Sequence, residues 1–84
     1  MYGLKLQKCV DMSKFEDLIN IIEEFKNFAP SGINFGYFIS YDIQNNTATI
    51  KVECSSNDIH EIIDLDNKMC QIDSNVDRIR FDVN

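Results

Sequence analysis

Residues 33–43 read INFGYFISYDI, and a large apolar side chain occupies every second position. This period of two is typical of a strand with one buried face. We therefore expect the core side of this strand to carry Ile33, Phe35, Tyr37, Ile39, Tyr41 and Ile43. Asn45 and Asn46 follow, and asparagine tolerates the left-handed conformation that tight turns need. Because the alternation resumes over residues 47–54, the sequence predicts a β-hairpin here.

Further strand and helix patterns flank this hairpin. Residues 2–10 and 76–83 alternate, whereas residues 14–29 and 56–70 repeat apolar side chains at helical spacing. In the last strand, the predicted inward residues are Ile79, Phe81 and Val83, and the predicted outward ones are Arg78, Arg80 and Asp82. The predicted order is strand, helix, strand, strand, helix, strand.

Each helix has one predicted apolar stripe. The first helix is expected to begin with a capping box formed by Ser13 and Glu16. Its stripe contains Phe15, Leu18, Ile19, Ile22, Phe25 and Ala29, and leaves Ile21 and Phe28 outside. Polar residues 55–58 are expected to cap the second helix, whose stripe contains Ile59, Ile62, Ile63, Met69 and Cys70. Asp66 falls inside this second stripe, and we expect Lys26 of the first helix to neutralise it, since a buried carboxylate needs a partner.

This order of elements predicts the fold. Eighty-four residues suit one domain, residues 1–84. Right-handed crossovers lead to a ferredoxin-like βαββαβ sandwich of the α+β class. We expect a four-stranded antiparallel sheet in the spatial order 4-1-3-2, with both helices on one face. The hairpin strand 33–43 then lies at a sheet edge, where a bulge at Gly36 or a partner strand should protect it.

Composition narrows the class of partner. Fourteen Asp and Glu against eight Lys and Arg give a net charge of −6. This charge argues against binding to nucleic acid or to an anionic membrane, and it favours a protein partner with a basic surface. No apolar run is long enough to span a bilayer, and residues 1–5 do not resemble a signal peptide. The expected location is the cytoplasm, bacterial or that of a host if the chain is phage-encoded.

No arrangement of residues indicates catalysis. Cys9, Cys54 and Cys70 are widely spaced, as expected of buried free thiols rather than of a disulfide framework or a zinc site. His60 stands alone. Residues 73–77 match the start of a calcium-binding loop but lack its glycine and its terminal glutamate. We therefore expect no enzyme activity, no metal and no cofactor.

Two surfaces are candidates for binding a partner. The helix layer is expected to be acidic through Glu16, Asp17, Glu23, Glu24, Asp58, Glu61 and Asp64. The open face of the sheet is expected to be locally basic and to carry Lys5, Phe38, Lys51, Arg78 and Arg80. We favour the helix layer, because most of the net charge is expected there and electrostatic steering acts on net charge.

These features predict a non-enzymatic protein-binding module. Small acidic proteins without chemistry of their own often act as inhibitors, such as immunity proteins, antitoxins or phage anti-defence proteins, by steric and electrostatic blocking. The alternative is a dimeric amino-acid-type sensor, although residues 11–13 lack the glycine expected of its first loop. Single-stranded RNA binding on the open sheet is a weaker alternative, since Phe38 is its only expected aromatic residue. Edge strand 33–43 also suggests a homodimer.

Overall fold

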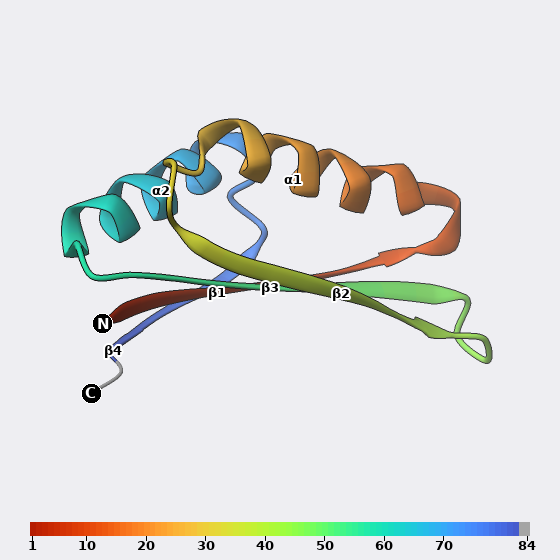
Figure 1. The fold of residues 1–84 in the computed structure, drawn as a ribbon. Coiled ribbons are helices and arrows are strands. Elements are labelled where there is room, and N and C mark those ends of the chain that lie inside the picture. The colour runs from red at the N-terminus through yellow and green to blue at the C-terminus, as the bar shows by residue number, and fades with distance from the viewer. Residues whose placement is uncertain (83–84) are drawn as a thin grey trace.

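The computed structural model describes residues 1–82, and its elements follow one another in the predicted order (Figure 1). A short 3₁₀ turn, η1 (Met12–Lys14), is added between the first strand and the first helix. The strands and helices are β1 (Tyr2–Asp11), α1 (Phe15–Phe28), β2 (Asn34–Asp42), β3 (Thr47–Ser56), α2 (Ile59–Ile72) and β4 (Asp77–Asp82). Val83, which was predicted to face the core, lies outside the described residues.

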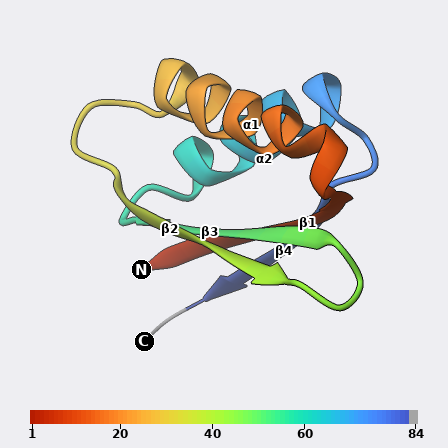
Figure 2. The same ribbon diagram turned by 90° about the vertical axis from the view of Figure 1, so that its right-hand side faces the viewer.

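The four strands form one antiparallel sheet in the order β2-β3-β1-β4, as predicted. The central β1–β3 ladder is unbroken from the pair Tyr2–Ser56 to the pair Asp11–Thr47. Both helices cover the same face of the sheet, and the other face is open (Figures 1 and 2). The chain is therefore a ferredoxin-like α+β sandwich. Neither helix in residues 1–82 is long and apolar enough to cross a membrane.

The core lies between the helices and the two central strands. Its largest fully buried side chains come from every layer: Leu4, Leu18, Phe25, Ile50, Cys54, Ile62, Leu65 and Met69. The alternation of β1 and β3 and the helical spacing of α1 and α2 supply these residues, and in β1 and β3 the phase is the predicted one. In α2 the buried stripe is displaced from the predicted one: Leu65, which was left outside it, is 1% exposed, whereas Ile59 is exposed and Ile63 and Cys70 are half-buried.

The predicted stripe of α1 is rotated in the structure. Ile21 is 4% exposed although it was placed outside the stripe, whereas Ile19 is 38% exposed although it was placed inside. The flank that carries Ile21 and Phe28 faces α2, where the Lys68 amine lies 5.7 Å from the centre of the Phe28 ring. The flank of α1 that carries Ile21 is thus covered by α2. If α1 packed on the sheet alone, this flank would be exposed.

The start of α1 also differs from the prediction. Instead of a capping box, the Asp11 carboxylate accepts a hydrogen bond of 3.0 Å from the Ser13 backbone amide and thereby begins η1. Lys14 then occupies the N-cap position without a side-chain hydrogen bond. The start of α2 agrees with the prediction, since the Asp58 carboxylate accepts a hydrogen bond of 2.8 Å from the His60 amide.

β4 has the opposite phase to the one predicted. Its register places Arg78 beside Leu6 and Arg80 beside Leu4, and both leucines are buried under the helices. Directly paired residues share a face of a sheet. The two arginines therefore lie on the helix side, whereas Ile79 and Phe81 lie on the open face, and the predicted inward packing of Ile79 and Phe81 is wrong.

The carboxylate of Asp66 in α2 explains why Arg78 and Arg80 of β4 face the helices. Its side chain is 16% exposed, and its carboxylate oxygens lie 3.1 Å from the Arg78 Nε and 3.5 Å from the Arg80 Nε. The predicted partner Lys26 is wrong, since its amine instead lies 6.0 Å from the centre of the Tyr37 ring. Asp66 Oδ1 and Arg78 Nη1 are buried without a hydrogen bond, so charge rather than ideal hydrogen-bond geometry holds the group together. Contact with Cys70 and the charge of Asp66 raise the pKa of Arg78.

The rotation of α1 generates a first prediction. Ile21→Ala should lower the free energy of unfolding by about 2–5 kcal/mol, because it leaves a cavity between α1 and α2. Ile19→Ala, the same change two residues earlier, should cost less than about 1 kcal/mol because its side chain is partly in solvent. Urea unfolding of both variants measures the difference. Equal losses would contradict the observed rotation of the helix.

The Asp66 contacts generate a second prediction. Asp66→Ala should lower the free energy of unfolding by about 2 kcal/mol, because two arginines lose the charge that compensates them in a partly buried site. Asp64→Ala is the matched control in the same helix: its pair with Lys68 is exposed, and the loss should stay below about 0.5 kcal/mol. Thermal or urea unfolding measures both values. An Asp66 variant as stable as the Asp64 variant would be the contrary result.

Candidate functional site

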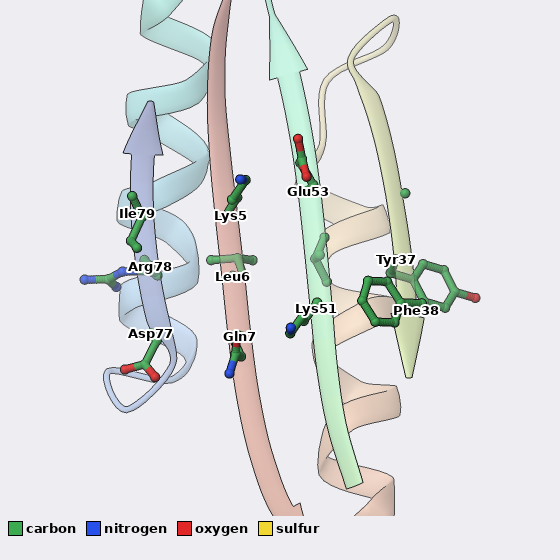
Figure 3. A pocket seen from close by; sticks show the side chains of 12 residues that line it. Lys5, Leu6, Gln7, Tyr37, Phe38, Lys51, Glu53, Asp77, Arg78 and Ile79 are labelled. Carbon is green, nitrogen blue, oxygen red and sulfur yellow. The ribbon is translucent and has the colours of Figure 1, made fainter. Parts of the chain in front are cut away.

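The open face of the sheet forms a shallow concave surface that all four strands contribute to. It has a volume of about 770 Å³. Figure 3 views this surface, with side chains from β1 (Lys5, Gln7), β2 (Phe38), β3 (Lys51, Glu53) and β4 (Asp77, Ile79). The cross-strand registers bring these residues together, since Lys51 pairs with both Gln7 and Phe38, and Lys5 pairs with both Glu53 and Ile79.

Apolar side chains stand at both edges of this surface. Phe38 is 58% exposed and Ile79 is 65% exposed. Phe81 lies beside Ile79 on β4 and covers Gly3, where the Cβ of any other residue would overlap the aromatic ring. The Lys5 amine lies 5.1 Å from the centre of the Phe81 ring, and the Lys51 amine lies 5.8 Å from that of Phe38. The open face thus combines exposed apolar surface with two lysines placed over aromatic rings.

The open face lacks the predicted excess of positive charge. Lys5, Phe38 and Lys51 lie there as predicted, but Arg78 and Arg80 face Asp66 on the other side of the sheet. The carboxylates of Glu53 and Asp77 balance the two lysines. Sequence reasoning also missed Ile79 and Phe81 as surface residues, because it gave β4 the wrong phase. The open face is therefore more apolar and less basic than the sequence indicated.

Six of the seven acidic residues predicted for the helix layer lie within the two helices and Asp58 directly precedes α2, but they differ in exposure and in their contacts. Asp58 caps α2, and the Asp64 carboxylate lies 2.9 Å from the Lys68 amine. Glu24 and Glu61 are half-buried. The remaining three, which are all on α1, are exposed: Glu16, Asp17 and Glu23.

Edge strand β2 is more exposed than its alternation predicted. Phe35, Tyr37 and Tyr41 point to the helix side, where the Phe35 ring lies 5.1 Å from that of Phe25 and the Tyr41 ring lies 6.0 Å from that of Phe15. These three aromatic side chains are nevertheless between 37 and 58% exposed, because α1 packs mainly over β1 and β3. The predicted bulge at Gly36 is absent, since the β2–β3 register is continuous from Asn34 to Asp42.

The residues weighed for chemistry remain apart. His60 is exposed at the start of α2, and Cys54 is buried in the core, where burial raises the pKa of its thiol to about 11. Cys9, expected to be buried, is exposed on β1. Asp73 forms an ion pair with Lys8, which lowers the pKa of the carboxyl. Within residues 1–82, His, Cys, Asp and Glu side chains form no group of three that could hold a metal ion.

Comparison with known proteins identifies the fold and no family. Neither a family model nor a curated protein matches the chain. Among solved structures, the de novo designed protein Foldit4 superposes with a TM-score of 0.69 at 17% identity, over 99% of this chain and 96% of that one. CutA1 from Pyrococcus horikoshii superposes with a TM-score of 0.58 at 10% identity, over 100% of this chain and 84% of that one.

A second kind of solved structure is much longer than this chain. An amidase of the hydantoinase/carbamoylase family from Burkholderia phymatum has a TM-score of 0.58 at 8% identity, over 95% of this chain. The chain spans only 27% of that amidase. At these identities each likeness concerns the arrangement of strands and helices alone.

The positions of the cysteines generate a third prediction. A maleimide should modify Cys9 of the folded protein at neutral pH, because Cys9 is exposed on the open side of the sheet. Cys54 should stay unmodified, since a thiol with a pKa of about 11 is ionised at roughly one part in 10⁴ at pH 7. Mass spectrometry of digested peptides measures both sites, and unfolding in urea should make Cys54 accessible. Modification of Cys54 at the rate of Cys9 in the native protein would be inconsistent with this structure.

Proposed function

We propose that the chain is a non-enzymatic protein-binding module that binds its partner through the open face of the sheet. The observation that carries this proposal is the exposure of Phe38 and Ile79, with the half-buried Phe81 beside Ile79, on a sheet face that no element of residues 1–82 covers (Figure 2). Exposed apolar side chains grouped on one face are typical of interaction surfaces. Aromatic residues surrounded by polar ones are also typical of the energetic centre of a protein interface.

The charge of the open face supports a protein partner more than a nucleic acid. Lys5 and Lys51 are balanced by Glu53 and Asp77, so the surface offers little attraction for phosphates. RNA-binding sheets of this shape stack bases on aromatic residues, mostly in the central strands, whereas Phe38 and Phe81 stand on the two edge strands. A partner with an apolar patch and carboxylates that reach the lysines would match the surface best.

We further propose that binding blocks the partner, in the manner of an inhibitor, immunity protein, antitoxin or phage anti-defence protein. The small size of the chain and its net charge of −6 support this class. The exposed carboxylates of α1 lie on the layer opposite the open face, so they would act at long range. There they would orient the chain as it approaches a basic partner, while the open face makes the contact. The alternative of a dimeric small-molecule sensor stays a prediction, and the connection from β1 to α1 still offers no glycine.

The test compares the two faces of the molecule. The double variant Phe38→Ala/Ile79→Ala should weaken binding to a partner captured from the native cell at least about tenfold, because both side chains belong to the proposed contact. The double variant Glu23→Lys/Glu24→Lys should change the association rate and its salt dependence more than the dissociation rate. Surface plasmon resonance measures both rates, and circular dichroism checks that each variant is folded.

The opposite pattern would overturn the choice of surface. If reversing the two glutamates abolished binding while the open-face variant bound like the native chain, the helix layer would be the contact surface. Binding of free amino acids to the native chain, measured by calorimetry, would favour the sensor instead.

A further inference from the structure

Edge strand β2 lacks the usual protection against pairing with another strand. Its nine residues pair with β3 without a bulge, and its other side is unpaired in the described part of the chain. The strand contains neither proline nor lysine, and its only charged residue is Asp42 at the end. Regular edges without these features are templates for a further strand.

The opposite edge of the sheet is protected. β4 has six residues, of which four are charged: Asp77, Arg78, Arg80 and Asp82. Charges along an edge oppose pairing with another strand. A heterologous contact between β2 of one copy and β4 of the next, which would lead to open chains of molecules, is therefore disfavoured. The difference between the two edges points to β2 as the surface for association.

We propose that β2 pairs antiparallel with β2 of a second copy of this chain, about a twofold axis at Phe38. The two four-stranded sheets then form one continuous sheet with eight strands. This register places Phe38 beside its own symmetry mate and uses all nine residues of the strand. The inference goes beyond the proposed function, because it concerns the sheet edge and leaves Ile79 and Phe81 of the open face free.

The proposed register is complementary in charge and shape. It places Asp42 beside Asn34 of the second copy, so the only charged residue of the strand meets an amide instead of another carboxylate. It also places Phe35 beside Tyr41 and Tyr37 beside Ile39 of the second copy. Aromatic pairs and aromatic–β-branched pairs across strands stabilise antiparallel sheets.

Helix α1 adds apolar surface beside the same edge. Phe15 contacts Tyr41, and Lys26 lies over Tyr37, so this ridge of α1 runs along β2. Ile19 lies on the same ridge, four residues after Phe15, and is exposed. A second copy paired with β2 would extend its own aromatic residues toward Ile19 and cover it.

The area available indicates a reversible dimer. From their exposed fractions, Phe35, Tyr37, Phe38 and Tyr41 offer about 400 Å² per copy. Two copies thus offer about 800 Å², to which the strand backbones and Ile19 add. This total is near the lower limit of about 1,200 Å² for specific interfaces, so we expect a dissociation constant in the micromolar range.

Sedimentation equilibrium over micromolar to submillimolar concentrations tests the association. The native chain should shift from monomer to dimer and should not form larger species. Tyr37→Lys introduces a lysine at the middle of the edge and should raise the dissociation constant at least about tenfold. Ile79→Lys is the matched control at the opposite edge and should leave the dissociation constant unchanged. Circular dichroism shows whether both variants keep the native fold.

Disulfide cross-linking tests the register without relying on a destabilising variant. In a Cys9→Ser background, Phe38→Cys should form an intermolecular disulfide on mild oxidation, because directly paired residues have Cα atoms about 4.5–5.5 Å apart. Ser40→Cys lies on the same face of the same strand, but it would be about 14 Å from its symmetry mate and should not form one. Non-reducing electrophoresis separates the two outcomes.

Each outcome decides for or against the proposal. Concentration-dependent dimers, weakened by Tyr37→Lys and cross-linked only through Phe38→Cys, would support it. A monomer at all concentrations would overturn it. A dimer that is weakened by Ile79→Lys and not by Tyr37→Lys would also overturn it, since association would then use the open face. Cross-linking through Ser40→Cys alone would exclude the twofold axis at Phe38.

Discussion

The partly buried carboxylate of Asp66 determines which side of β4 faces the helices. A carboxylate in this position needs cationic partners, and Arg78 and Arg80 supply them from alternate positions of the neighbouring strand. Because side chains of a strand alternate, the residues between and beyond the arginines must face the other way. Ile79 and Phe81 lie on the open face for this reason. An ionic contact between the helix layer and the sheet thus generates the apolar character of the opposite face of the sheet.

The fold was predictable from the sequence because most elements carry a strong pattern. The alternation of β1 and β3 and the polar caps of α2 agreed with the structure. The predictions failed where a second neighbouring element decides which side of a helix or strand is buried. Ile21 is buried by α2, which a helical wheel for α1 alone does not include. The phase of β4 was ambiguous because arginines alternate with apolar residues, and only the partner required by Asp66 resolves it. That carboxylate in the apolar stripe was visible in the sequence, but it was assigned to Lys26.

The candidate binding surface was less predictable than the fold. The sequence indicated Lys5, Phe38 and Lys51 correctly as residues of the open face, since they follow from well-patterned strands. It could not indicate how far α1 covers β2, because the position of a helix over a sheet depends on the packing of the whole layer. The exposure of Phe35, Tyr37 and Tyr41 is a consequence of that packing. The molecule therefore has two adjoining apolar surfaces, an open face and a free edge, which meet at Phe38.

The placement of β1 between β3 and β4 affects how the chain acquires its structure. The first strand can pair with β3 once residues 47–56 have been synthesised. Its other edge can form hydrogen bonds only after residues 77–82 have been synthesised. Contacts between such distant parts of a chain are slow to form, because a long loop must close before they stabilise anything. During synthesis on the ribosome, the centre of the future sheet therefore has an unsatisfied edge until almost the last of these residues has emerged. In a nascent chain halted before Asp77, the long strand β1 would be an open edge in place of the short, charged β4, in addition to the open edge of β2, and this would favour aggregation.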